Sequence, residues 1–150
     1  MELPYSVLSR SESDTENAGG MLADYIKNNG LNDVFIAMYG DLGAGKTTFV
    51  RGLCRVLAPG KRVCSPTFTV VNEYRGEFTV RHCDMYRIEN EDDLYSVGFY
   101  DFDDGVTVAE WCEKIPFALP GSYIRVSIGK TDGGREIRIE RMDGNADSGN

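Results

Sequence analysis

Residues 40–47 read GDLGAGKT, a glycine-rich stretch that ends in a lysine and a threonine. Glycines have no Cβ, so such a loop turns tightly and brings consecutive backbone N–H groups close to an anion. The stretch matches G-x-x-x-x-G-K-[ST], in which the lysine reaches the β- and γ-phosphates of a nucleoside triphosphate and the hydroxyl binds Mg²⁺. The spacing therefore predicts a phosphate-binding loop for a nucleoside triphosphate and magnesium.

Each residue type in this loop has its own expected role. Lys46 supplies positive charge and is expected to act in catalysis as well as in binding, Thr47 supplies a hydroxyl for Mg²⁺, and Thr48 is placed to touch the α-phosphate. The positive end of the following helix dipole adds to the attraction for phosphate. The nucleotide-binding residues expected from the sequence are Gly43, Ala44, Gly45, Lys46, Thr47 and Thr48.

The segments on both sides of the loop support this interpretation. Residues 33–39 read DVFIAMY, a nearly continuous apolar run typical of a strand buried on both faces of a parallel sheet. Residues 49–57 carry apolar side chains at helical spacing, and Pro59 and Gly60 follow at the expected end of the helix. A strand, a loop and a helix in this order argue against a glycine-rich turn that binds nothing.

Magnesium also needs an acidic partner near the loop, and two strand-like runs end in a carboxylate. Residues 78–84 end in Asp84, and the more apolar run 106–110 ends in Glu110. We expect Glu110 to lie beside the metal, and Asp84 to orient the attacking water or to contact metal-bound water. The two roles could be exchanged. Either acid could also cap a nearby helix or face solvent.

Residues 65–68 read SPTF, between the helix that follows the loop and the next expected strand. Switch segments of P-loop hydrolases carry a threonine at this place in the chain that senses the γ-phosphate, which makes Thr67 the candidate here. Alone, a Ser-Pro-Thr sequence is a common turn. Trp111, directly after Glu110, is expected to pack against neighbouring residues and not to stack on a base.

Composition restricts the partners and the compartment. The chain has 150 residues, a net charge of −8 and a pI near 4.6, which disfavours direct binding to nucleic acid or to anionic membranes. Any contact with nucleic acid is therefore expected to be indirect. No apolar stretch is long enough to span a membrane, and residues 1–5 lack a signal-peptide pattern, so we expect a cytoplasmic protein. The four cysteines include no C-x-x-C pair and His82 is the only histidine, so we expect reduced thiols and no zinc site.

The remaining pattern predicts one domain over residues 1–142 and a disordered tail over 143–150. Ser13 begins an S-x-x-E capping box that predicts a helix over residues 14–29. Two further features predict β-hairpins, one joining residues 68–74 to 78–84 and one joining 122–128 to 135–141. Hairpins beside a buried parallel strand imply a mixed sheet.

Residues 89–104 combine seven acidic residues with interleaved aromatic and aliphatic side chains. Two interpretations fit this pattern. The segment could be a solvated acidic helix, or it could be a partner-binding surface with aromatic anchors.

Five motifs in this order resemble the TsaE (formerly YjeE) family of ATPases of bacterial tRNA threonylcarbamoyladenosine biosynthesis. They are residues 40–49 (GDLGAGKTTF), 65–68 (SPTF), 82–87 (HCDMYR), 91–102 and 110–113 (EWCE). Many proteins share the phosphate loop, but its ordered combination with the other motifs is specific. The resemblance covers about residues 13–140.

The resemblance implies an α/β P-loop NTPase fold with a mixed, mainly parallel central sheet flanked by helices. It implies Mg²⁺-dependent ATP hydrolysis within a complex with TsaD-like and TsaB-like proteins, which together attach threonylcarbamoyl to an adenosine of tRNAs that read codons starting with A. Carried over by position, Lys46 and Thr47 would bind phosphate and metal, Glu110 would bind Mg²⁺, Asp84 would assist hydrolysis, and Thr67 would be the switch-like residue. Cys112 replaces the family's usual proline after Trp111, which leaves the geometry of that loop open.

Two other functions remain open at this stage. A small nucleoside or nucleotide kinase also uses a phosphate loop, but it closes an arginine-bearing lid over the phosphates, and the stretch 89–104 is acidic. A non-catalytic, nucleotide-dependent binding module is the third candidate. A phosphate loop with two strand-end carboxylates favours hydrolysis over binding alone.

Overall fold

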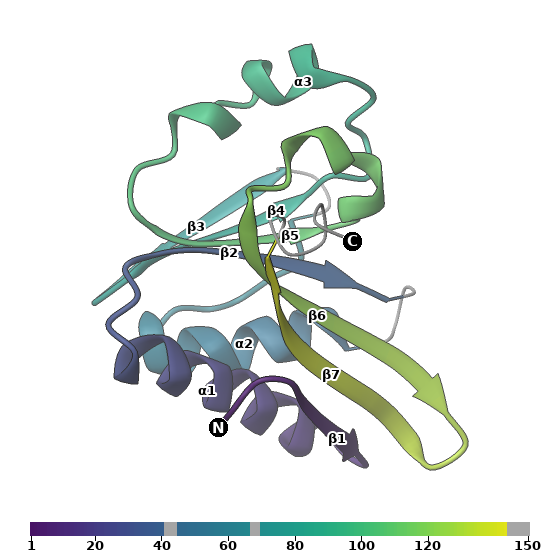
Figure 1. Cartoon of the computed structure of the whole chain (residues 1–150). Coiled ribbons are helices and arrows are strands. Elements are labelled where there is room, and N and C mark those ends of the chain that lie inside the picture. Colours follow the sequence, from purple (N-terminus) through teal and green to yellow (C-terminus); the bar gives the residue numbers. More distant parts are fainter. Residues whose placement is uncertain (41–44, 67–69, 144–150) are drawn as a thin grey trace.

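The computed structural model describes residues 1–40, 45–66 and 70–143. A seven-stranded sheet with the order β1-β7-β6-β2-β5-β4-β3 forms its centre (Figure 1). The strands are β1 (Tyr5–Ser9), β2 (Asp33–Tyr39), β3 (Val71–Arg75), β4 (Thr79–Asp84), β5 (Gly105–Glu110), β6 (Ser122–Thr131) and β7 (Gly134–Asp143). The helices are α1 (Glu12–Asn28), α2 (Lys46–Leu57) and α3 (Glu91–Ser96), with the 3₁₀ turns η1 (Phe99–Asp101), η2 (Cys112–Lys114) and η3 (Pro116–Ala118).

The sheet is parallel at its centre and antiparallel towards both edges. β2 pairs in parallel with β5 on one side and β6 on the other, and β4 pairs in parallel with β5. The pairs β3–β4, β6–β7 and β1–β7 are antiparallel. The predicted fold class and both predicted hairpins are therefore confirmed. β2 is apolar along most of its length because helices and turns cover both of its faces.

Two hydrophobic cores hold the layers together, one on each face of the sheet. α1 and α2 lie side by side on one face, and α3 and the 3₁₀ turns lie on the other (Figure 1). The larger core lies between the sheet and the α1–α2 pair and includes Leu22, Phe49 and Leu53. The smaller core lies between the sheet and α3 with the 3₁₀ turns, and it includes Met85 and Leu94, the buried residue of α3.

The predicted N-cap of α1 at Ser13 is wrong, since the helix begins two residues earlier. Ser11 is the N-cap, its side chain accepts a hydrogen bond from the Asp14 amide, and Asp14 Oδ2 accepts one from the Arg10 amide. Glu16, the expected partner of Ser13, instead forms ion pairs with Arg51 and Arg55 of α2. Glu16 therefore forms ion pairs with α2 and does not take part in capping α1.

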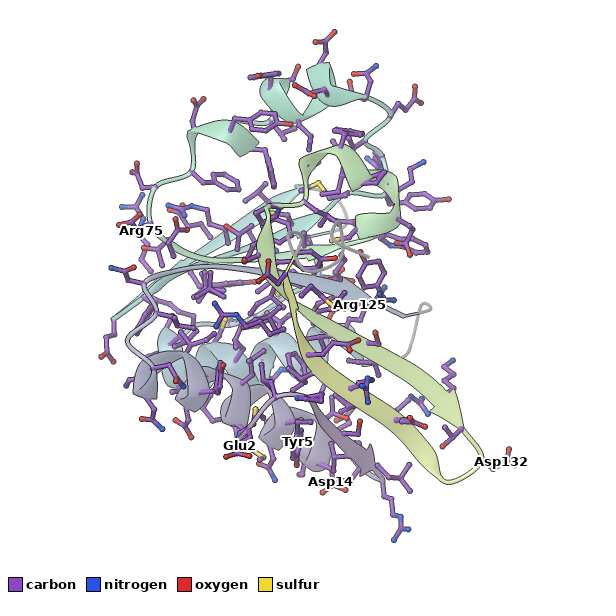
Figure 2. All side chains as sticks on the ribbon, viewed as in Figure 1. Glu2, Tyr5, Asp14, Arg75, Arg125 and Asp132 are labelled. Carbon is purple, nitrogen blue, oxygen red and sulfur yellow. The ribbon has the colours of Figure 1, made fainter. Side chains whose placement is uncertain are left out.

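β1 was not predicted, because a run of five residues in which only Ser9 is buried gives a weak strand pattern. It exists through pairing with β7, in which Tyr5 lies opposite Ile139 and Ser9 lies opposite Arg135. β6 and β7 form a long hairpin that projects beyond the rest of the molecule, with Asp132 near its tip (Figure 2).

The predicted boundary after residue 142 remains a prediction. β7 continues through Asp143, and residues 144–150 lie outside the described part of the chain. None of the helices in the described ranges is both long and apolar enough to cross a membrane.

The acidic stretch 89–104 is split between a buried and an exposed side. Leu94 is fully buried, and Phe99 and Phe102 pack against the smaller core. Tyr95 and Tyr100 are 60% and 41% exposed, and their ring centroids lie 4.5 Å apart. The segment is therefore anchored by apolar residues and presents a pair of tyrosines in ring contact together with exposed carboxylates.

Arg81 of β4 fixes this segment to the sheet. Its Nη1 donates to the backbone oxygen of Asp103 at 2.9 Å, its Nε pairs with Glu73 at 3.1 Å, and its guanidinium lies over the Phe102 ring. The acidic surface therefore has a defined position relative to β4.

Candidate functional site

The carboxyl ends of three neighbouring strands bring the predicted acids and the phosphate loop together. β2 leads into the loop and α2, while β4 and β5 end at Asp84 and Glu110. In the parallel register, Glu110 lies beside both Asp84 and Met38 of β2. Ligands of open α/β sheets bind at this edge, because the strand-to-helix turns meet there.

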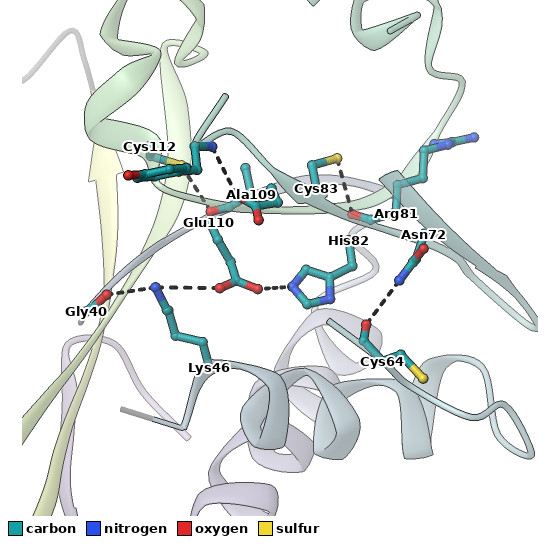
Figure 3. Close-up of polar contacts among 12 residues, drawn as sticks. Gly40, Lys46, Cys64, Asn72, Arg81, His82, Cys83, Ala109, Glu110 and Cys112 are labelled. Carbon is teal, nitrogen blue, oxygen red and sulfur yellow. Dashed lines mark hydrogen bonds and ion pairs between the residues drawn. The ribbon is translucent and has the colours of Figure 1, made fainter. Parts of the chain in front are cut away.

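Lys46 lies in the first turn of α2 and points towards the sheet (Figure 3). Gly45, at the N-cap, has φ of +106°, a conformation that favours glycine, and it has no side chain to cap the helix. The Lys46 Nζ donates to the backbone oxygen of Gly40 at 2.7 Å and lies 3.5 Å from Glu110 Oε1. Lys46 is only 5% exposed, so this ammonium group is held within the protein beside the predicted metal ligand.

Glu110 is buried and has a donor at each carboxylate oxygen. His82 Nε2 contacts Oε2, on the side opposite to Lys46 (Figure 3). Burial by itself raises the pKa of Glu110, but the hydrogen bond and charge of His82 and the charge of Lys46 outweigh it, so that the pKa lies below its usual value. Glu110 is therefore kept ionised, which suits a metal ligand.

Asp84 lies next to Glu110 but in a different environment. It is partly exposed, and its Oδ1 accepts a hydrogen bond from the Tyr86 amide at 3.0 Å. Glu110 lines the cavity in front of α2, whereas Asp84 is not among the residues that line it. The geometry brings the two predicted carboxylates together and leaves Asp84 further from the cavity.

Three of the predicted site residues, Gly43, Ala44 and Thr67, lie outside the described residues. The flanks of Thr67 are defined. The Val70 amide donates to Pro66 O at 2.9 Å, and Val70 O accepts from the Asp84 amide at 2.7 Å. Val70, three residues after Thr67, is therefore hydrogen-bonded to the backbone of the residue predicted to assist hydrolysis.

Contacts from β3 fix the chain just before this segment. Tyr74 Oη accepts a hydrogen bond from the Cys64 amide and donates one to Cys64 O, which also accepts from Asn72 Nδ2. These contacts position the neighbouring Ser65, which lines the cavity.

A cavity of about 450 Å³ opens in front of α2, within the range of small-molecule sites. Its lining on the α2 side comes from Gly45, Lys46, Thr47 and Thr48, with Glu110 behind them. These are the predicted nucleotide-binding residues that the structure describes. The cavity therefore brings Lys46, Thr47 and Glu110 around one space.

The other wall of the cavity was missed by the sequence reasoning. It comes from the β1–α1 junction and the start of β7, with Ser9, Arg10, Ser11, Glu12, Thr15, Gly134 and Arg135. The antiparallel register places Ser9 opposite Arg135, and Ser9 Oγ lies 2.6 Å from Thr15 Oγ1. No local motif marks these residues, because a pairing between the two ends of the chain brings them to the site.

Trp111 packs against its neighbours, as expected, but it also contacts the site. Its ring lies 5.1 Å from that of Tyr86, and the Lys46 Nζ lies 4.8 Å from its centroid. Trp111 has φ of +60°, a left-handed conformation that is uncommon and costly for a bulky residue. Cys112, which follows Trp111, is buried and its Sγ donates to Ala109 O at 3.1 Å.

The donor set fits a magnesium nucleotide. Mg²⁺ keeps most of its waters and needs only one or two protein oxygens, which the Thr47 hydroxyl and the ionised Glu110 carboxylate can supply. The described residues contain no cluster of three or more His, Cys, Asp or Glu side chains arranged for a metal ion.

A family model described as "Threonylcarbamoyl adenosine biosynthesis protein TsaE" matches residues 9–137 of the chain. Among curated proteins, the tRNA threonylcarbamoyladenosine biosynthesis protein TsaE of Treponema pallidum is 33% identical over 135 residues, covering 88% of this chain and 97% of the relative. The protein of the same name from Bacillus subtilis is 38% identical over 104 residues, covering 68% and 66%.

The fold is also similar to a solved structure. The crystal structure of Bacillus subtilis YdiB superposes with a TM-score of 0.74 and 28% sequence identity, covering 97% of this chain and 90% of that one. Together, the family model, the curated relatives and the shared fold show that the chain belongs to the TsaE family of threonylcarbamoyladenosine biosynthesis proteins.

Proposed function

We propose that this protein is the Mg²⁺-dependent ATPase subunit of a cytoplasmic machinery that makes N6-threonylcarbamoyladenosine (t6A) in tRNA. The observation that carries the proposal is the single cavity that joins Lys46, Thr47 and Glu110 in front of a helix N-terminus. The names of the relatives supply the biological context, tRNA threonylcarbamoyladenosine biosynthesis.

The two walls of the cavity suggest how ATP lies in it. The phosphates would lie against the first turn of α2, where backbone N–H groups and Lys46 attract negative charge. The nucleoside would lie towards the β1–α1 junction and Arg135, the wall that carries Ser9 and Thr15. Bound Mg²⁺ would neutralise charge on the phosphates during hydrolysis.

The chain's own residues divide the remaining work. Lys46 exchanges its contacts with Gly40 and Glu110 for the β- and γ-phosphates. Glu110 holds the metal side, and Asp84, beside it on β4, orients the attacking water. Thr67 acts as the γ-phosphate sensor, three residues before Val70, whose oxygen accepts a hydrogen bond from the Asp84 amide.

Two competing functions predict different products. A kinase needs cationic groups on a closing lid, whereas residues 89–104 contain seven acids and no lysine or arginine. A pure binding module would leave ATP intact. Incubation with Mg–ATP and analysis of the products separates the three: ADP with free phosphate supports the ATPase, a phosphorylated acceptor supports the kinase, and unchanged ATP supports the binding module.

The exposed side of the α3–η1 segment is our proposed contact with TsaD-like or TsaB-like partners. Acidic residues surround Tyr95 and Tyr100, whose rings are in contact, so a complementary partner surface would be basic with an apolar centre. tRNA would then be contacted through the complex, because this acidic chain repels the phosphate backbone.

Charge reversal at Asp92, Asp101 and Asp104 tests this contact. Asp93 is left unchanged, because its carboxylate accepts a hydrogen bond from the Glu89 amide and stabilises the start of α3. The triple variant should bind the partners at least about tenfold more weakly and bind ATP like the wild type. Asp132→Lys, at the hairpin tip, is the control (Figure 2). Unchanged partner affinity in the triple variant would exclude this surface.

A further inference from the structure

Two side chains contact the carboxylate of Glu110, and they differ in how far they can move. Lys46, on Oε1, is a long side chain that faces the cavity and has two other contacts, Gly40 O and the Trp111 ring. His82, on Oε2, is fully buried on β4. Lys46 can therefore turn away from Glu110 towards a phosphate, whereas His82 cannot follow.

The surroundings of His82 argue that its imidazole serves more than packing. Two of its neighbours on the same face are apolar, Val80 two residues earlier on β4 and Val108 opposite it on β5. The third, Asn72 opposite it on β3, is polar, and its amide donates to Cys64 O. A buried polar ring costs free energy unless it is hydrogen-bonded, and His82 Nδ1 has no hydrogen-bond partner among the described residues. Within the described part of the chain, the contact with Glu110 is the only hydrogen bond of this ring, so an apolar residue would suit this buried position better unless that contact is needed.

We propose that His82 is a positioning residue for the metal-binding carboxylate. The ring donates its Nε2–H to Oε2 and holds it against the sheet, which leaves Oε1 as the oxygen that faces the cavity. When Lys46 moves to the phosphates, Oε1 is released in a fixed direction towards the metal or its bound water. Residues that orient a metal ligand in this way typically change metal affinity about 10–100-fold when they are removed. This inference rests on the proposed function, since it assumes that Glu110 binds Mg²⁺.

The test compares His82→Leu, which removes the donor, with His82→Gln, whose terminal amide can place an N–H near the position of Nε2. Val80→Ala is the control for a buried change on the same strand and face that does not touch Glu110. Binding of Mn²⁺, in place of Mg²⁺, is measured by electron paramagnetic resonance with a non-hydrolysable ATP analogue present. Affinity for the analogue without metal and the thermal unfolding temperature are measured in parallel.

We expect His82→Leu to weaken Mn²⁺ binding at least about tenfold while analogue affinity without metal changes less than about twofold. His82→Gln should recover most of the Mn²⁺ affinity even if its unfolding temperature falls. Val80→Ala should lower the unfolding temperature and keep wild-type Mn²⁺ affinity. If His82→Leu does not fold, the comparison of His82→Gln with His82→Asn, whose amide is too short to reach Glu110, replaces it.

A folded His82→Leu or His82→Asn with wild-type Mn²⁺ affinity would overturn the inference, as would an equal loss in Val80→Ala. In a Glu110→Gln background, loss of His82 should cost less than about twofold, because its target carboxylate is gone. A tenfold further loss there would also contradict the inference. A wild-type protein that binds neither the analogue nor Mn²⁺ would instead overturn the proposed function.

Discussion

At the scale of single residues, the ammonium group of Lys46 lies between Gly40 O, the Glu110 carboxylate and the Trp111 ring. All three are electron-rich, so they hold the ammonium group close to the place where phosphates would bind. The sequence alone predicts a phosphate-binding role for Lys46, because the loop, the lysine and the helix are continuous in the chain. It does not predict the role proposed for His82, since its partner Glu110 is 28 residues away and the strand register brings them together.

Lys46→Ala should remove the charge-assisted contacts to the β- and γ-phosphates, each worth about 1.5–3 kcal/mol. ATP affinity should fall at least about tenfold and hydrolysis should stop, while the fold survives. Isothermal titration calorimetry with Mg–ATP measures the change. Lys114→Ala, which removes a lysine that lies over the Tyr86 ring, is the control and should bind ATP normally. Wild-type ATP affinity and hydrolysis in Lys46→Ala would contradict the assigned role.

Substitutions of the two neighbouring carboxylates, Glu110 and Asp84, should have different effects on metal dependence and turnover. Glu110→Gln should raise the Mg²⁺ concentration needed for half-maximal activity, because Glu110 lines the cavity beside Thr47. Asp84→Asn should slow turnover and leave nucleotide binding nearly intact. Magnesium titrations of both variants provide the measurement. The opposite pattern would mean that the two acids exchange roles.

At the scale of elements, α1 and α2 cross at two glycines. A Cβ on Gly19 would lie 2.1 Å from Phe49 O, and a Cβ on Gly52 would lie 1.9 Å from Glu16 O. The close crossing fixes the axis of α2, whose first turn carries Lys46 and Thr47. The sequence predicted both helices from their apolar spacing. It could not show which glycines allow the contact, because adjacent glycines look alike in one helix.

Gly19→Ala and Gly20→Ala should therefore change stability in opposite directions. The new methyl group at position 19 meets backbone atoms of α2 and should cost about 1–3 kcal/mol or more. At position 20 the nearest atom is 3.8 Å away, so alanine should stabilise the helix by about 0.5–1 kcal/mol. Urea unfolding of both variants measures the difference. Equal effects would mean that the helices are not in close contact at Gly19.

The two errors in element prediction have different causes. Ser11 is the N-cap of α1 because its side chain accepts a hydrogen bond from the Asp14 amide, a local contact two residues before the predicted cap. β1 forms because β7, which is distant in the sequence, supplies its hydrogen bonds. The predicted strand at Asp33–Tyr39 and the phosphate-loop helix depend on local patterns, and the structure confirms both.

At the scale of the whole molecule, burial divides the four cysteines into three inaccessible thiols and one exposed thiol. Burial raises the pKa of Cys54 and of Cys112 to about 12 and raises that of Cys83 as well. Because the thiolate is the reactive form, a raised pKa leaves almost none of it at pH 8. Cys64 is exposed.

A thiol reagent such as Ellman's reagent should therefore modify one cysteine rapidly in the folded protein at pH 8, and all four after unfolding. Cys64→Ser should abolish the rapid reaction. Rapid reaction of two or more thiols in the folded wild type would contradict the packing of the two cores.

We propose above all that this protein hydrolyses ATP in its cavity and works as one subunit of a tRNA-modifying assembly. The most direct measurement is phosphate release from Mg–ATP by the wild-type chain, alone and together with TsaD-like and TsaB-like partners and tRNA. We predict slow release alone, clear stimulation by the partners, and no release from Lys46→Ala in either condition. Absence of phosphate release in every combination, or transfer of the phosphate to an acceptor, would contradict the account.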